Sequence, residues 1–269
     1  MDETVDIRDL QLATLQILID IQTVCRRHKI PFYLGYGTLI GAIRHQGFIP
    51  WDDDIDIMMT RADYERFYAV WEELGPDYLL QDWRRLGDFW AYHPKVRLLT
   101  PKPYLDTLIE DVTDNNGLFV DIFPLDYLPQ ADSWRQRMMA RFLFINRLAL
   151  SAKQFGHHDP RRLIRALSRL AQLIPMAWFR QAMLRGSTRW NTSPSDWVVA
   201  YGATVSALPN VMPLACFGEP IELPFESVQM PVPSGYDALL RQEYGDYMQI
   251  PPEGQRANHG FRRNPDYKP

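Results

Sequence analysis

The most constraining feature of the sequence is a crowded acidic run that alternates with isoleucine. Residues 52–57 read Asp-Asp-Asp-Ile-Asp-Ile, so four carboxylates lie beside side chains that favour burial. Such crowding is unfavourable unless a cation lies nearby. On a β-strand, side chains two residues apart share a face, so Asp54 and Asp56 would point together while Ile55 and Ile57 enter the core. We expect Asp54 and Asp56 to hold one divalent metal ion, joined by Asp52 if the strand begins early enough.

Two other interpretations of the acidic run are weaker. A solvated acidic turn does not explain the strict alternation with isoleucine. An EF-hand loop would place Asp52, Asp54 and Asp56 at its first, third and fifth positions, but Ile57 then stands where glycine is required. Its twelfth position would be Asp63 where a bidentate glutamate is expected.

A glycine-rich turn precedes the acidic run by one short helix. Residues 35–41 read Gly-Tyr-Gly-Thr-Leu-Ile-Gly, which does not match the dinucleotide-binding pattern of glycines. The turn follows a predicted strand at 32–37 and opens a short helix through residues 39–43. Backbone N–H groups at such a helix start suit a phosphate, and Gly37 and Thr38 are the residues we expect to bind it.

The rest of the pattern predicts an α+β protein. The chain has 269 residues, of which 46% are apolar, enough for a sizeable core. Apolar spacing predicts a helix over 9–29, and strands are expected near 54–58, 95–99 and 118–123. Short strands and turns are expected around 222–232, then a helix at 236–244 and an extended tail at 251–269. We divide the chain into a catalytic core at 1–130, a basic helical segment at 131–195 and a C-terminal segment at 196–269 that packs back on the core.

Charge is distributed unevenly. Residues 134–190 hold twelve Arg and Lys against one acid, Asp159, whereas the remainder holds 17 basic and 32 acidic residues. We expect this basic segment to form two or three helices, broken near 156–160 and at Pro175. Its arginines recur among Leu, Ile, Phe and Met, which favours peripheral contact with an anionic membrane or a lipid-linked acceptor over nucleic acid.

Other features indicate a cytoplasmic protein, with peripheral contact at the inner face of the membrane. The N-terminus is acidic and lacks the basic and apolar pattern of a secretory signal. We find no uninterrupted apolar stretch of about 18 residues, the length that a spanning helix needs. Cys25 and Cys216 lie in apolar contexts without metal-binding spacing and are expected in the core.

Four blocks of the sequence together resemble the LicD family of phosphocholine transferases, to which fukutin and fukutin-related protein are also similar. The blocks are Gly-Thr-Leu-Ile-Gly-Ala-Ile-Arg-His at 37–45, Phe-Ile-Pro-Trp-Asp-Asp-Asp-Ile-Asp-Ile at 48–57, Val-Asp-Ile-Phe-Pro-Leu-Asp at 120–126, and Tyr-Gly-Asp-Tyr-Met at 244–248 followed by Pro-Pro at 251–252 and by His259. They span nearly the whole chain, although the basic segment contributes no motif. One departure is Phe225-Glu226-Ser227, where Phe-Glu-Gly is expected.

The resemblance implies a nucleotidyltransferase-fold core, with a small mixed sheet and flanking helices, plus a helical basic insertion. It implies transfer of a phosphorylated alcohol, phosphocholine by default, from a CDP-activated donor to a glycan hydroxyl, with release of CMP. Asp54 and Asp56 would hold Mg²⁺ or Mn²⁺ against the donor's pyrophosphate. Asp121 would be a further ligand or the base that accepts the acceptor's proton.

The donor's pyrophosphate also needs cations opposite the metal. Arg44, His45, Lys95, Arg97 and His259 are the candidates, with Arg44 the first choice because it closes the glycine helix. A choline donor would also call for aromatic rings around its quaternary ammonium. The rings available for this are Trp51, Trp83, Trp90, Tyr92, Tyr244 and Tyr247.

Three alternatives to phosphocholine transfer stay open at this point. The transferred group could be ribitol phosphate, glycerol phosphate or phosphoethanolamine. The same carboxylates could serve a nucleotidyltransferase that adds NMP to a small molecule or RNA by attack at the α phosphorus. A noncatalytic binding module is hard to reconcile with three retained aspartates.

Overall fold

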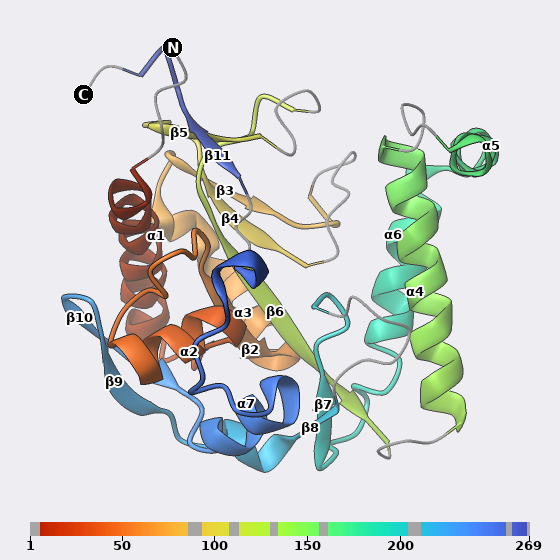
Figure 1. Ribbon diagram of the computed structural model, residues 1–269. Helices are drawn as coiled ribbons and strands as arrows, with labels where there is room; N and C mark the ends of the chain where they lie inside the picture. Colours follow the sequence, from red (N-terminus) through yellow and green to blue (C-terminus); the bar gives the residue numbers. More distant parts are fainter. Residues whose placement is uncertain are drawn as a thin grey trace. The chain divides into compact units, whose positions relative to one another are not determined.

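The structure is a computed structural model that describes residues 6–85, 93–107, 113–129, 134–155, 161–203, 211–256 and 260–267. The chain divides into two compact units (Figure 1). Unit 1 comprises residues 1–80, 95–122 and 215–269, and unit 2 comprises residues 81–94 and 123–214. Unit 1 combines helices with a sheet whose strands include runs without an intervening helix, β3 to β6 and β9 to β10, which agrees with the α+β class.

Unit 1 begins with a long amphipathic helix, α1 (Ile7–Arg27), close to the predicted range. The side chain of Asp6 caps it by accepting a hydrogen bond from the Arg8 N–H, and Arg26 and Arg27 lie in its last turn. Apolar residues at helical spacing, among them Ile17, are fully buried in the main core. Helix α1 therefore forms one wall of that core.

The sheet of unit 1 carries the motifs. Its strand order is β1-β2-β6-β4-β3, with β1 (Tyr33–Leu34), β2 (Asp56–Thr60), β3 (Tyr78–Gln81), β4 (Lys95–Leu98) and β6 (Phe119–Leu128). Strands β1 and β2 are antiparallel, as are β4 and β6. Helix α2 (Tyr36–His45) joins β1 to the acidic run, and α3 (Arg61–Val70) follows β2, continuing into a short 3₁₀ helix, Trp71–Leu74. The acidic run thus leads directly into a core strand beside β6.

The C-terminal residues complete unit 1. Strands β9 (Ile221–Phe225) and β10 (Val228–Val232) form a hairpin that follows a 3₁₀ turn at Leu214–Phe217, and α7 (Tyr236–Tyr244) has the predicted bounds. The expectation of an extended tail is wrong in part. It contains a 3₁₀ turn at Glu253–Gln255 and a strand, β11 (Phe261–Arg263), that pairs with β5 (Tyr104–Asp106).

Unit 2 contains the basic segment as α4 (Trp134–Phe155), α5 (Arg162–Gln172) and α6 (Met176–Ser187). The predicted breaks are confirmed, since α4 ends before 156–160 and Pro175 caps α6. Strand β7 (Trp197–Val199) pairs antiparallel with the last residues of β6, and β8 (Val211–Pro213) pairs antiparallel with β7. Leu143, Leu150, Phe179 and Met183 form the centre of a separate core.

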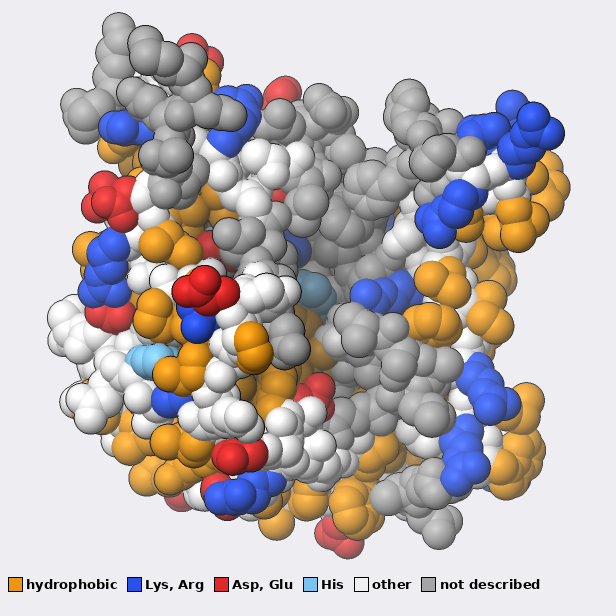
Figure 2. Space-filling model, viewed as in Figure 1, with side chains coloured by type: hydrophobic (Ala, Val, Ile, Leu, Met, Phe, Trp, Pro, Cys, Tyr) orange, Lys and Arg blue, Asp and Glu red, His pale blue; other side chains and the backbone are white. Residues whose placement is uncertain are grey.

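The outer surfaces of these helices are unusual. Figure 2 shows basic and apolar side chains interleaved over α4 and α5. Within the described ranges, none of the helices combines the length and the apolar character that crossing a membrane requires.

Candidate active site

The turn before the acidic run is fixed by helix α1. The buried Gln11 donates its amide to two carbonyl oxygens, that of Ile49 at 3.2 Å and that of Asp52 at 2.8 Å. The backbone N–H of Asp52 in turn bonds the carbonyl oxygen of Ile49 at 2.9 Å. Because the backbone is held at both ends of residues 49–52, the position of the chain that carries the following aspartates is fixed.

The glycine turn fixes Asp56 at the start of β2. The hydroxyl oxygen of Thr38 accepts a hydrogen bond from the Asp56 N–H at 2.9 Å, and the Asp56 carbonyl accepts one from the Gly35 N–H at 2.9 Å. Thr38 is buried, only 3% exposed. The sequence predicted that Thr38 donates a hydrogen bond to a phosphate, whereas in the structure its hydroxyl oxygen holds the backbone N–H of Asp56.

Three carboxylates converge from two neighbouring strands. One oxygen from each of Asp54, Asp56 and Asp121 lies within 4.8 Å of the others. Asp54 comes just before β2, and Asp121 on β6 bonds the intervening Ile55 carbonyl through its N–H at 2.8 Å. Burial, followed by the negative charges of Asp54, Asp121 and Asp52, raises the pKa of Asp56 well above its ordinary value. The arrangement therefore has an excess of negative charge that a cation would relieve.

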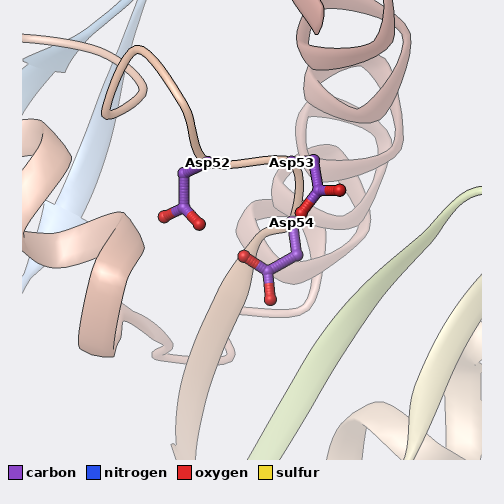
Figure 3. A group of neighbouring side chains, drawn as sticks. All are labelled: Asp52, Asp53 and Asp54. Atoms are coloured by element: carbon purple, nitrogen blue, oxygen red, sulfur yellow. The ribbon is translucent and has the colours of Figure 1, made fainter. Parts of the chain in front are cut away.

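Asp52 and Asp53 belong to the same run but point differently. Figure 3 shows the carboxylates of Asp52 and Asp54 on one side of the segment and that of Asp53 on the other. Asp53 accepts a hydrogen bond from the Gly260 N–H at 3.2 Å. A Cβ on Gly37 would come within 2.7 Å of an Asp52 carboxylate oxygen, so the glycine makes room for Asp52 at the start of α2. An anionic group at that helix start is electrostatically favourable.

Lys95 provides a buried positive charge beside the carboxylates. It pairs directly with Asp121 across β4 and β6, and its Nζ lies 2.5 Å from Asp121 Oδ1. The same Nζ lies 3.7 Å from the ring centroid of Phe119. Lys95 and Asp121 are 9% and 4% exposed, so the pair is shielded from water. This contact holds the Asp121 carboxylate in one orientation.

Arg97 shares the face of Lys95, as the strand periodicity predicts, but its partners differ. Its guanidinium contacts Asp106 at 3.3 Å and donates to the Gly117 carbonyl at 2.5 Å. Arg97 is only 1% exposed, and burial lowers its pKa. These contacts tie β4 to β5 and to the turn before β6, and a phosphate contact of Arg97 stays a prediction.

Arg44 and His45 lie at the opposite end of α2 from Gly37. The Arg44 guanidinium donates to the Tyr247 carbonyl at 2.8 Å and to His45 Nε2 at 2.9 Å. Arg44 lies seven positions after Gly37 on the helix, about 10 Å along the axis. The structure therefore places Arg44 where it fastens the turn after α7. His259, the remaining predicted phosphate ligand, lies outside the described residues.

Two tyrosines that the sequence did not assign to phosphate or metal lie close to the carboxylates. Burial and then Asp56 raise the pKa of Tyr36, and burial followed by Asp56 raises that of Tyr244. Tyr36 has φ +44°, a left-handed conformation that is uncommon for a residue with a side chain and is found at functional sites. The Gly-Tyr-Gly triplet at 35–37 was visible in the sequence, but its backbone conformation was not.

The rings considered for a choline cage are dispersed. Tyr244 lies near the carboxylates, whereas the Arg256 guanidinium lies 4.3 Å from the ring centroid of Trp51. Tyr247 is buried and donates its hydroxyl to Asp237. Trp83 packs against the core of unit 2, and Trp90 and Tyr92 lie outside the described residues.

Glu226 is a further residue that sequence reasoning missed. It forms the tip of the β9–β10 hairpin with φ +56°, and its carboxylate accepts a hydrogen bond from the Phe48 N–H at 3.0 Å. Its backbone N–H bonds the Gln46 carbonyl at 2.8 Å, and Arg8 on α1 pairs with its carboxylate. A Cβ on Gly47 would come within 2.3 Å of that carboxylate. The only sequence clue was that the expected Phe-Glu-Gly here reads Phe-Glu-Ser.

Comparison with known proteins agrees with this arrangement. A model of the LicD/FKTN/FKRP nucleotidyltransferase domain matches residues 29–146, which include the glycine turn, the acidic run and Asp121. A relative from Haemophilus influenzae, named lipopolysaccharide cholinephosphotransferase LicD, is 32% identical over 94% of this chain and 95% of its own length. An uncharacterised protein of Rickettsia prowazekii is 29% identical over 44% of this chain and 41% of its own length. On the strength of the near full-length match, the chain belongs to the LicD family.

Proposed function

We propose that the protein is a LicD-type phosphotransferase that moves phosphocholine from a CDP-activated donor to a glycan hydroxyl and releases CMP. The observation that carries this proposal is the convergence of Asp54, Asp56 and Asp121 within 4.8 Å. The name of the Haemophilus relative supports phosphocholine as the transferred group and lipopolysaccharide as the class of acceptor.

We further propose that unit 1 has a nucleotidyltransferase fold. A glycine turn, a short helix, an Asp-x-Asp segment entering β2 and a third aspartate on the neighbouring β6 are the organisation expected for it. The description of the matching family domain uses the same term.

The chemistry of the donor set fits a hard divalent cation. Asp54, Asp56 and Asp121 offer carboxylate oxygens, the ligands that Mg²⁺ and Mn²⁺ prefer. Burial and then the neighbouring negative charges raise the pKa of Asp56, and a bound cation would balance those charges. When bound, the ion would neutralise negative charge on the donor's pyrophosphate. Asp52 lies near enough to Asp54 to contribute a further oxygen.

The protein's own residues then position the reactants. The acceptor hydroxyl attacks the phosphorus that carries choline, and the bond from that phosphorus to the bridging oxygen of CMP breaks. The hydroxyl proton passes to a carboxylate oxygen. Asp121, held by Lys95 at 2.5 Å, either accepts this proton or completes the ligand set. Positioning is most of the catalytic task in phosphoryl transfer.

A double-label experiment separates this proposal from nucleotidyl transfer. The protein would be incubated with Mg²⁺, a lipopolysaccharide acceptor and CDP-choline labelled in the choline with one isotope and in the cytidine with another. We expect choline label on the glycan and cytidine label in free CMP. Cytidine label retained on the acceptor would contradict the proposal and favour attack at the α phosphorus.

Substitution of the carboxylates tests the site itself. Asp54→Asn and Asp56→Asn should each reduce turnover by about 10³-fold or more, because each removes a charged ligand at the reacting phosphate. Asp63→Asn is the matched control, since Asp63 lies on α3, where it pairs with Arg66 at 2.9 Å. Near-normal activity in Asp54→Asn or Asp56→Asn would contradict the metal assignment.

The donor's head group can be identified by thermal stabilisation. A ligand that binds only the folded protein raises the melting temperature, and at equal concentration the ligand with the higher affinity raises it more. We expect CDP-choline with Mg²⁺ to raise it more than the CDP forms of ribitol, glycerol or ethanolamine. A larger rise in melting temperature with one of those donors would contradict phosphocholine and indicate that alcohol as the transferred group.

A further inference from the structure

The helices of unit 2 expose an unusual amount of apolar surface. Among the described residues, sixteen large apolar side chains are exposed, and eleven of them lie between residues 134 and 178. These eleven are Trp134, Met138, Phe142, Ile145, Leu148, Leu163, Leu167, Leu170, Leu173, Ile174 and Trp178. We call this set the apolar face. Soluble monomers rarely expose so many large apolar side chains together, and such patches mark binding surfaces.

Helix α5 shows how the apolar face arises. Ser168 and Ala171 are buried and form the side of α5 that packs beside α4. Leu163, Leu167 and Leu170 recur at spacings of four and three residues on another side, and they are 71%, 46% and 62% exposed. Because the packing side is already satisfied, the leucines form a second apolar stripe that remains exposed among the described residues of unit 2.

The apolar face continues into a groove between α4 and α5. Its volume is 610 Å³ and its lining is almost entirely aliphatic, from Ile145 and Leu148 on α4 to Ile164, Leu167 and Leu170 on α5. Among the described residues that line the groove, Arg161 is the charged one. A long apolar groove with a cation at its edge suits a hydrocarbon chain that ends in an anionic group.

Charge decides which partner fits this face. Arg162, Arg165 and Arg169 recur on α5 at spacings of three and four residues, beside the leucine stripe, and Figure 2 shows basic side chains interleaved with apolar ones over α4 and α5. The whole stretch 134–190 has twelve basic residues and one acid. A second copy of the same face would bring like charges together, which opposes a homodimer through it. Nucleic acid would satisfy the arginines but leave the leucines in water.

We propose that the apolar face of α4, α5 and α6 docks on the surface of a membrane that contains anionic phospholipids. The leucines and tryptophans enter the boundary between head groups and acyl chains, and the arginines contact the phosphates. This inference does not depend on the proposed function, because binding to vesicles is measured without turnover.

The test is co-sedimentation of the full-length protein with large vesicles. We expect binding to vesicles of seven parts phosphatidylcholine and three parts phosphatidylglycerol at 50 mM salt, and weaker binding at 500 mM salt. Partitioning onto vesicles of phosphatidylcholine alone should be weaker by about tenfold or more, because the arginines have no anionic head groups to contact.

Paired variants separate the two contributions. Leu163→Asn with Leu170→Asn should reduce partitioning at least about tenfold at both salt concentrations, because two apolar side chains no longer enter the lipid. Arg162→Gln with Arg169→Gln should reduce it about tenfold at low salt only. Leu12→Asn with Ile221→Asn, exposed positions of unit 1, and Arg26→Gln with Arg27→Gln on α1 are the matched controls and should bind normally.

Four outcomes would overturn the proposal. These are absence of sedimentation with anionic vesicles at 50 mM salt, equal binding to neutral vesicles, and equal loss of binding in the control variants. The fourth is a protein that sediments as a dimer in the ultracentrifuge and becomes a monomer in Leu163→Asn with Leu170→Asn, which would assign the apolar face to a second copy. Retained far-UV circular dichroism in every variant excludes unfolding as the cause.

Discussion

Asp56, a proposed metal ligand, illustrates how one side chain of the candidate site is positioned by residues distant in sequence. Its N–H donates to the Thr38 hydroxyl and its carbonyl accepts from the Gly35 N–H, so the glycine turn holds the backbone on both sides of the Asp56 Cα. The strand periodicity predicted that Asp54 and Asp56 act together, and Ile55 and Ile57 are fully buried as expected. The pairing of residue 38 with residue 56 could not be predicted, because it depends on how α2 packs against β2.

Thr38 provides a test of this positioning. Thr38→Val has nearly the same shape but leaves the Asp56 N–H without its acceptor, a loss of about 1–3 kcal/mol in a buried setting. We expect a lower free energy of unfolding and a lower kcat. Thr38→Ser keeps the hydroxyl oxygen and should keep most of both. A kcat that is equal in the Val and Ser variants would show that the hydroxyl does not position Asp56.

At the scale of elements, helices were easier to predict than strands. The bounds of α7 and the breaks around α5 follow from apolar spacing and proline, which act within a few residues of the chain. The pairing of β5 with β11 joins residues about 157 positions apart, and a local sequence pattern does not reveal such a distant partner. The fixed position of the acidic run likewise depends on α1 and on the β9–β10 hairpin.

The hairpin β9–β10 is predicted to support the site through Glu226. Hydrogen bonding to Arg8, its largest contribution, and to the Phe48 N–H lowers the pKa of Glu226 against the opposing effect of burial. Glu226→Gln keeps an oxygen for Phe48 and loses the ion pair, which is half exposed on the Arg8 side. We expect a loss of about 1 kcal/mol or less. Glu226→Ala also removes the acceptor for Phe48 and should cost about 1–3 kcal/mol more.

The pH dependence of this effect has a definite sign. Because the folded-state pKa of Glu226 is lowered, its stabilisation is complete above the unfolded value of about 4.3 and is lost as pH falls through the folded value. Urea unfolding of wild type and Glu226→Gln should therefore differ at pH 7 and converge in acid. A difference that persists unchanged below the folded pKa would contradict the ion-pair explanation.

At the scale of the whole molecule, the chain leaves unit 1 twice, over residues 81–94 and again over residues 123–214. Composition predicted a basic insertion, since residues 134–190 hold twelve basic residues against one acid, and the structure shows that they form helices with their own core. The predicted division into residues 1–130, 131–195 and 196–269 stays a prediction. The charge count alone could not show which residues unit 1 needs for its core.

The C-terminal segment should be indispensable to unit 1. Phe225, Met230, Val232 and Leu240 are at most 2% exposed and belong to the same core as α1 and β2. Burial of each such side chain contributes about 1.5–3 kcal/mol, so their joint loss approaches or exceeds the whole net stability of about 5–15 kcal/mol. A chain that ends after residue 214 should lose the cooperative urea transition followed by near-UV circular dichroism. A chain that ends after Asn264 keeps this core and the β5–β11 pair, and should unfold cooperatively; equal transitions in the two truncations would show that unit 1 folds without its C-terminal segment.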